Sequence, residues 1–128
     1  METAQQVAII KAIVKKEFFI KELESLQRTL DFIQEEQAFV KQKITHYLDI
    51  IDEASWIEWA EDMQQQILNR EAALYLLKKD IQKLKSKKLV DTIEVKKQKL
   101  QLNYLENEFL TWKQEVDLKL DSVAALDN

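Results

Sequence analysis

The residues of this sequence best suited to chemistry are acids and tryptophans gathered in residues 49–63, DIIDEASWIEWAEDM. Trp56 and Trp59 are three residues apart, so on a helix they occupy neighbouring positions of one face. The acids of this acidic corner, with no Lys or Arg between them, are Asp49, Asp52, Glu53, Glu58, Glu61 and Asp62. Two interpretations stand. In the first, both tryptophans close the end of a helical core and the acids are solvated. In the second, Trp56, Trp59, Asp52, Glu53, Glu61 and Asp62 bind a basic protein partner, because Trp often anchors interfaces.

Catalysis and metal binding have no comparable support. His46 is the only histidine and there is no cysteine, which excludes the usual His/Cys zinc sites. The four serines have no base partner that the sequence pattern identifies. Adjacent acids such as Glu35 and Glu36 point to different sides of a helix, so they do not form an acid–base pair. We therefore expect no enzyme activity, no catalytic residue, no cofactor, no metal ion and no small-molecule substrate.

A lysine cluster lies between residues 78 and 99, where nine lysines oppose only Asp80, Asp91 and Glu94. Nucleic acid or an anionic membrane could use such a positive field. However, all of these bases are Lys rather than Arg, and the whole chain has a net charge of −4. We expect a solvated surface here. Nucleic acid is a disfavoured partner.

The composition decides the fold class. The chain has 128 residues, of which 46% are hydrophobic and 33% charged, and it has no Gly, no Pro and no Cys. Hairpin turns, bulges and nucleotide-binding loops depend on glycine, so an all-α fold in one domain, residues 1–128, is expected. Lysines interrupt the first apolar run, and no run reaches the roughly 18 residues that span a bilayer. A cytoplasmic protein is therefore expected.

Apolar residues recur in sevens along the first half of the chain, as in one strand of a coiled coil. Gln37 is the single polar residue on this seam, and Thr3 with Gln6 forms a capping-box pattern at its start. These features predict a helix over residues 4–52. The seam residues are Leu23, Leu30, Ile44 and Ile51 on one side and Phe19, Leu26, Ile33, Val40 and Tyr47 on the other.

The rhythm changes phase between residues 52 and 58, where Ser55 and Glu58 form a second capping-box pattern. A second helix is predicted over residues 55–86. Asp91 and Glu94 mark a third start, which predicts a helix over 91–121, although one bent helix through residues 86–91 is the alternative. The architecture is thus an elongated antiparallel helical hairpin extended to a three-helix coiled-coil bundle.

These lengths leave part of the first helix without a neighbour. If the second helix pairs antiparallel with the first, residues 4–20 extend past it by about 24 Å. Soluble monomers avoid exposed apolar patches of this size. The segment must fold back as a fourth helix, dimerise or bind something else, and a self-associating or partner-binding segment is the favoured interpretation. Its proposed contact residues are Val7, Ile10, Ile13, Val14 and Phe18.

The expected function is therefore noncovalent. We expect a non-enzymatic protein-binding module, either an adaptor, a chaperone or a structural subunit, that forms a homodimer or a hetero-oligomer through helical faces. The alternative is peripheral membrane association. Residues 7–20 would then lie at the lipid interface, with Lys11, Lys15, Lys16 and Lys21 near the headgroups.

Tyr104 and Glu108 have the Tyr-x-x-x-acid spacing, which resembles the export signal of the small helical-hairpin substrates of type VII secretion. A Trp at a helix junction is also similar to the Trp-x-Gly turn of that family, although Glu58 stands in the glycine position after Trp56. The general shape is similar to coiled-coil adaptors and chaperones of bacterial secretion systems. This resemblance implies a small secreted helical hairpin, or a partner of such a system, as a further alternative.

Overall fold

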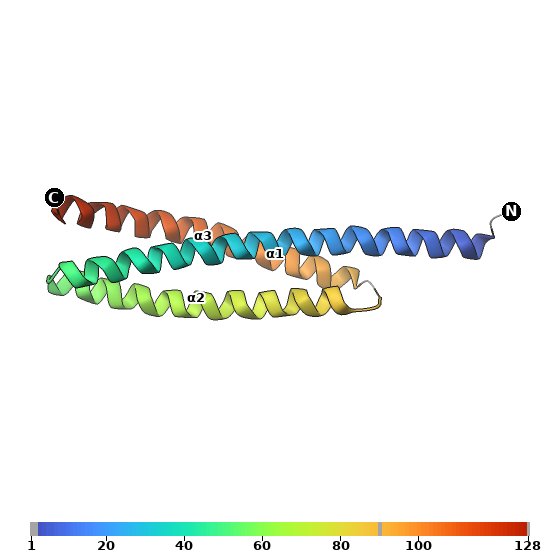
Figure 1. Ribbon diagram of the computed structural model, residues 1–128, viewed down its shortest axis with the longest axis horizontal. Helices are drawn as coiled ribbons and strands as arrows, with labels where there is room; N and C mark the ends of the chain where they lie inside the picture. The colour runs from blue at the N-terminus through green and yellow to red at the C-terminus, as the bar shows by residue number, and fades with distance from the viewer. Residues whose placement is uncertain (1–2, 90, 128) are drawn as a thin grey trace.

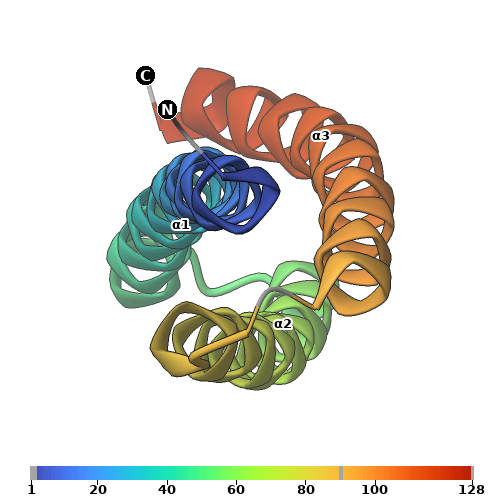
Figure 2. The same ribbon diagram turned by 90° about the vertical axis from the view of Figure 1, so that its right-hand side faces the viewer.

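The computed structural model describes residues 3–89 and 91–127 of the chain. It contains three helices, α1 (Ala4–Ile50), α2 (Ala54–Ser86) and α3 (Thr92–Asp127). Figure 1 shows that α2 runs antiparallel to α1 and that α3 turns back to run in the direction of α1. Figure 2, viewed along the bundle, shows the three helices grouped around a common axis. The predicted all-α architecture is confirmed, and the described residues include no strand.

The helix boundaries differ from the predicted ones by a few residues at most points. α1 ends at Ile50 rather than near residue 52, and α2 begins at Ala54. The largest difference is at the end of α3, which continues to Asp127 instead of fraying after residue 121. Val123 explains the extra turns, because it is 4% exposed and packs in the core.

The core consists of the residues that repeat in sevens, so the predicted seams are confirmed. Each buried aliphatic or aromatic side chain stabilises the fold by about 1.5–3 kcal/mol relative to an exposed one. α1 contributes Leu23, Leu30, Ile33, Val40 and Ile44; α2 contributes Trp56, Ala60, Met63, Ile67, Leu74, Leu77 and Ile81; α3 contributes Val95, Leu102, Phe109, Trp112, Val116, Leu120 and Val123.

The capping box predicted at the start of α1 is present. Thr3 Oγ1 accepts from the backbone N–H of Gln6 at 3.2 Å, and the Thr3 N–H donates to Gln6 Oε1 at 2.9 Å. The box predicted from Ser55 and Glu58 is wrong. α2 has Glu53 as its N-cap, and no side chain bonds to its first-turn N–H groups. Because the helix begins at Ala54, Ser55 is already inside the first turn, whereas a capping residue must precede it with extended backbone.

The predicted turn between α2 and α3 is also present, so the alternative of one bent helix is wrong. Asp91 caps α3, because its Oδ1 accepts from the N–H of Glu94 at 3.1 Å. Among the described residues none has a positive φ. The residues next to the turns are extended, with φ of −101° at Ile51, −91° at Glu53 and −69° at Lys87. Such backbone needs no glycine, which explains how this chain turns twice without one.

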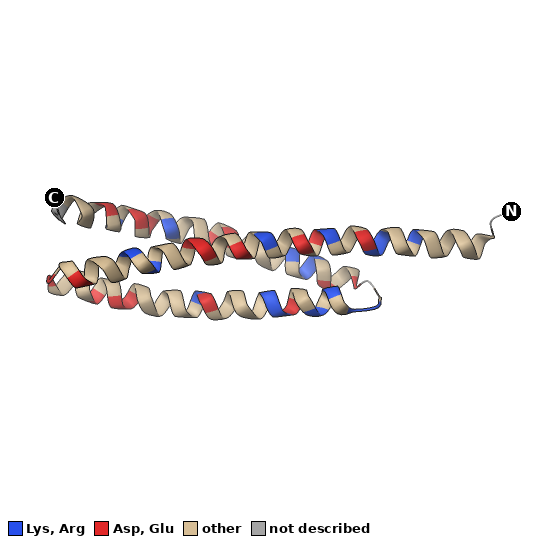
Figure 3. Ribbon diagram, viewed as in Figure 1, with Lys and Arg blue, Asp and Glu red and all other residues tan. Residues whose placement is uncertain are grey.

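Ion pairs between helices follow the edges of the core, and Figure 3 shows how the charges are distributed along the bundle. Each partly exposed pair contributes at most about 1 kcal/mol, but together they fix which turns of the helices face each other. The interhelical pairs are Lys41–Glu71, Lys78–Asp31 and Lys85–Glu24 between α1 and α2, Lys99–Glu22 and Lys113–Glu36 between α1 and α3, and Arg70–Glu108 between α2 and α3.

Two glutamines lie among the apolar core residues. Gln37 is 1% exposed, as its seam position predicted, and its Nε2 has no hydrogen-bond partner. Gln98 is also buried, with its Oε1 unpaired. The sequence analysis did not single out Gln98, although it falls in the same heptad register as Val95 and Leu102. Buried polar groups without partners reduce stability, so both positions are costly for the fold.

Candidate functional site

The most distinctive surface of the molecule is the part of α1 that projects beyond the turn between α2 and α3 (Figure 1). Residues 3–15 are all exposed, and the first fully buried residue of α1 is Leu23. The overhang predicted for residues 4–20 is therefore present, except that Phe19 and Ile20 are partly buried and Phe19 packs against the core. It does not fold back as a fourth helix, because α1 is continuous from Ala4 to Ile50.

The apolar side chains of this overhang face solvent. Val14 and Phe18 are each 59% exposed, while Ile10 and Ile13 are 51% and 54% exposed. Val7 is less accessible, at 36%. All five residues predicted as partner contacts on this segment are thus exposed and belong to one continuous helix.

Most of the overhang's apolar residues lie on the side of α1 that faces away from the bundle. Counting back in sevens from the core residue Leu23 leads to Lys16 and Ile9, and from Leu26 to Phe19 and Ala12, so the side that continues the core is only partly apolar. At 100° per residue, the remaining apolar positions project from the opposite half of the helix. We call this the outward stripe, and its members are Val7, Ile10, Ile13, Val14 and Phe18.

Lysines border the outward stripe. Lys11 and Lys15 lie along one edge and Lys16 along the other, and none of the three has an acidic partner within ion-pair distance among the described residues. The Lys15 ammonium is 6.0 Å from the centroid of the Phe19 ring. Glu17 is the one acid of the overhang. The segment is therefore apolar on one side and positively charged at its borders.

The two tryptophans of the acidic corner differ in how far they are buried. Trp56 is 2% exposed and packs edge-on against Tyr47, with ring centroids 6.4 Å apart. Trp59 is half-buried beside Trp56 at 5.2 Å, and the Lys119 ammonium is 5.9 Å from its ring. The predicted contact acids are all exposed, namely Asp52, Glu53, Glu61 and Asp62. Trp56 thus closes the core, and only Trp59 and the acids present surface to a partner.

The lysine cluster of residues 78–99 is partly neutralised by acids of α1. Lys78, Lys85 and Lys99 pair with acids of that helix, and Lys87 pairs with Asp91. The α1 acids are far away in sequence, so the composition of residues 78–99 overstated the positive field. Lys79, Lys83, Lys88, Lys96 and Lys97 have no acidic partner within ion-pair distance in the part of the chain that the structure describes.

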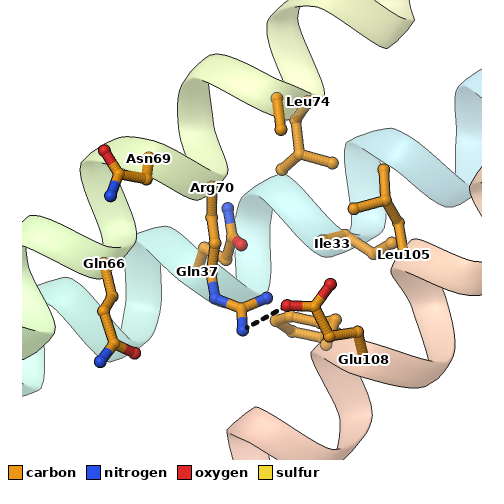
Figure 4. Close-up of a pocket in the computed structure, with 10 residues that line it drawn as sticks. Ile33, Gln37, Gln66, Asn69, Arg70, Leu74, Leu105 and Glu108 are labelled. Carbon is orange, nitrogen blue, oxygen red and sulfur yellow. Dashed lines mark hydrogen bonds and ion pairs between the residues drawn. The ribbon is translucent and has the colours of Figure 1, made fainter.

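A cavity of about 360 Å³ lies between the three helices (Figure 4). Arg70 crosses it to Glu108 at 3.1 Å, and the Trp112 indole N–H donates to Gln66 at 3.0 Å. Most of its polar lining is thus already bonded within the bundle. Gln37 Nε2, in the wall, is a buried polar atom without a hydrogen-bond partner. This arrangement holds α3 to α2, and it presents no catalytic pair.

The remaining motifs add no site. His46 is exposed on the bundle surface, with its ring 5.2 Å from that of Tyr47. Tyr104 is exposed, whereas Glu108 is paired with Arg70. The described residues contain no group of acids and histidines arranged to hold a metal ion. Among them there is also no helix long and apolar enough to cross a membrane.

Comparisons with protein-family models, curated proteins and solved structures return no match. The functional interpretation therefore depends on the geometry of the outward stripe and the acidic corner.

Proposed function

We propose that this protein is a non-enzymatic protein-binding module that associates through the outward stripe of α1. The observation that supports the proposal is that five apolar side chains are exposed on a stretch of α1 that no other part of the described bundle covers. Spacing of three, four and seven residues suits them to pack against another helix. An adaptor, a chaperone and a structural subunit are the roles that such a module would serve.

A helical protein partner fits this surface better than a membrane does. α1 is one continuous helix, so a membrane lying against the stripe would also approach the residues further along the same side. Those residues include Glu17, Arg28 and Glu35, all of which are exposed. Burying such charges at a lipid interface is unfavourable, whereas a protein can supply partners of opposite sign.

The solution mass tests the proposal. Light scattering of the full chain is expected to give a dimer, and of a chain lacking residues 1–15 a folded monomer. Residues 3–15 are all exposed, so the unfolding midpoint of the remaining bundle should be nearly unchanged by this deletion. The same number of chains per particle for the full and the shortened protein would contradict the proposal.

Two single substitutions provide a matched pair. Val14→Asp places a charge in the outward stripe, and Ala12→Asp places the same charge on the other side of the same helix. Only Val14→Asp is expected to give a monomer. If the Val14→Asp and Ala12→Asp chains are both monomeric, and only Val14→Asp abolishes co-sedimentation with anionic phosphatidylserine vesicles, the membrane alternative replaces the proposal.

A further inference from the structure

The outward stripe does not end with the overhang. Counting in sevens from Phe18 leads to Ser25, Phe32 and Phe39 on the same side of α1. Phe32 and Phe39 are each 54% exposed, although other residues of α1 contribute to the core. An apolar line thus continues along the body of the bundle.

Two hollows accompany this line where α1 meets α3. One, of about 330 Å³, is bordered by Phe32 and by Leu110, which is itself exposed. The other, of about 270 Å³, is bordered by Phe39 and Leu120. These hollows are of a size to receive side chains projecting from a helix laid along α1.

The charges on α1 indicate which helix that would be. About residue 23, Lys11 is mirrored by Glu35, and Glu17 is mirrored to within one residue by Arg28, so in each pair the two charges have opposite sign. Such a pattern is self-complementary only for two copies that run antiparallel.

We propose that two copies of this chain pair antiparallel through the outward sides of their α1 helices over residues 7–39, with the two-fold axis near residue 23. This inference rests on the proposed self-association and specifies its geometry. Val14 of each copy meets Phe32 of the other, and Val7 meets Phe39. Glu17 of each copy faces Arg28 of the other. Apolar contacts then occupy both ends of the interface and ion pairs its middle.

Parallel pairing along the same surface is disfavoured. In a parallel coiled coil the flanking residues that meet are five positions apart. Glu17 of each copy would then meet Glu22 of the other, so like charges would face each other on both sides of the seam. The antiparallel arrangement replaces these repulsions with attractions.

The bundles leave room for this arrangement. α2 and α3 cover the core side of α1, and the paired surface is the other side (Figure 2). With the axis near residue 23, the overhang of one copy lies along residues 26–42 of the other, and each bundle extends away from the axis. The outward stripe is thereby covered without displacing any helix.

Charge reversal tests the pairing without touching the core. Glu17→Arg brings two positive charges together across the interface, and Arg28→Glu brings two negative charges together. Either variant alone is therefore expected to raise the dimer dissociation constant at least tenfold. An equimolar mixture of the two variants should form heterodimers, and the chain with both substitutions should recover the homodimer. Glu58→Arg, in the exposed acidic corner, is the matched control and should dimerise normally.

Disulfide trapping reports direction, because the natural chain has no cysteine. Val14→Cys and Phe32→Cys chains are expected to crosslink with each other in a mixture and not to crosslink alone. Antiparallel pairing is overturned if Val14→Cys crosslinks alone, or if the charge reversals leave the dimer dissociation constant unchanged. Self-association would stand in both cases. If the natural chain is monomeric at every concentration, both proposals fail.

Discussion

The guanidinium carbon of Arg70 lies 4.5 Å from the centroid of the Trp112 ring, while Nη2 of the same side chain is 3.1 Å from Glu108 Oε1. One residue of α2 therefore holds α3 by a stacked contact and an ion pair at once. Arginine suits this position because its planar charged group can stack and bond simultaneously.

Arg70→Lys should separate these two contacts. Lysine keeps the charge but loses the planar stack, so we expect the free energy of unfolding to fall by about 1 kcal/mol. Urea denaturation followed by circular dichroism measures it. Lys79→Arg, the reverse exchange at an exposed position of α2, is the control and should change stability by less than about 0.5 kcal/mol. Equal effects of the two substitutions would mean that the Trp112 contact adds nothing.

Gln37→Leu should stabilise the bundle by about 1 kcal/mol, because it replaces a buried amide whose Nε2 has no partner with an apolar side chain of similar size. Urea denaturation again provides the measurement, with Gln34→Leu at an exposed position as the control. A loss of stability would show that the Gln37 amide is bonded in solution, through water or another side chain.

The seams, the two turns and the overhang were predictable from the sequence because they depend on periodicity. Leu23, Ile67 and Phe109 fall in the core since each repeats with its neighbours in sevens. The neutralisation of the lysine cluster was not predictable. Lys99 meets Glu22 only because α3 returns beside α1, and no local pattern records that approach.

The start of α2 is a second feature that the sequence pattern did not predict correctly. Ser55 and Glu58 have the spacing of a capping box, but spacing alone does not fix the residue at which the backbone becomes helical. The two interpretations of the acidic corner treated Trp56 and Trp59 alike, either as closing the core together or as binding a partner together. The structure buries the first and leaves the second half-exposed, because only Trp56 falls in the seam with Ala60 and Met63.

Substitutions at the two caps should differ in effect. Asp91→Ala removes the acceptor of the Glu94 N–H and should cost about 1 kcal/mol. Ser55→Ala removes only an exposed bond to the Glu53 carboxylate and should cost less than about 0.5 kcal/mol. Thermal unfolding of both variants checks this. A larger effect at Ser55 would place the start of α2 at that residue after all.

The ion pair of Lys113 should add a small amount to the free energy of unfolding, and this contribution should be lost at alkaline pH. Its hydrogen bond to Glu36 raises the pKa of the Lys113 ammonium above its ordinary value. A raised folded-state pKa stabilises the fold fully below the unfolded value of about 10.4, and this stabilisation is lost as the pH rises through the folded pKa. Lys113→Met should therefore be less stable than the natural chain at pH values of about 7–9, and the difference should shrink above about pH 10.5. A difference that stays constant up to a pH of about 11 would assign the effect to packing of the lysine stem instead.

The uninterrupted course of α1 has a mechanical consequence. Between the outward stripe at Val14 and the acidic corner at Ile50, the chain has neither a joint nor a proline, so the helix is a semi-rigid spacer of about 54 Å at 1.5 Å per residue. Any molecule held at the stripe and any molecule held at the acidic corner are thus kept at a set separation and a set relative orientation. The length of α1 therefore sets the distance between the outward stripe and the acidic corner.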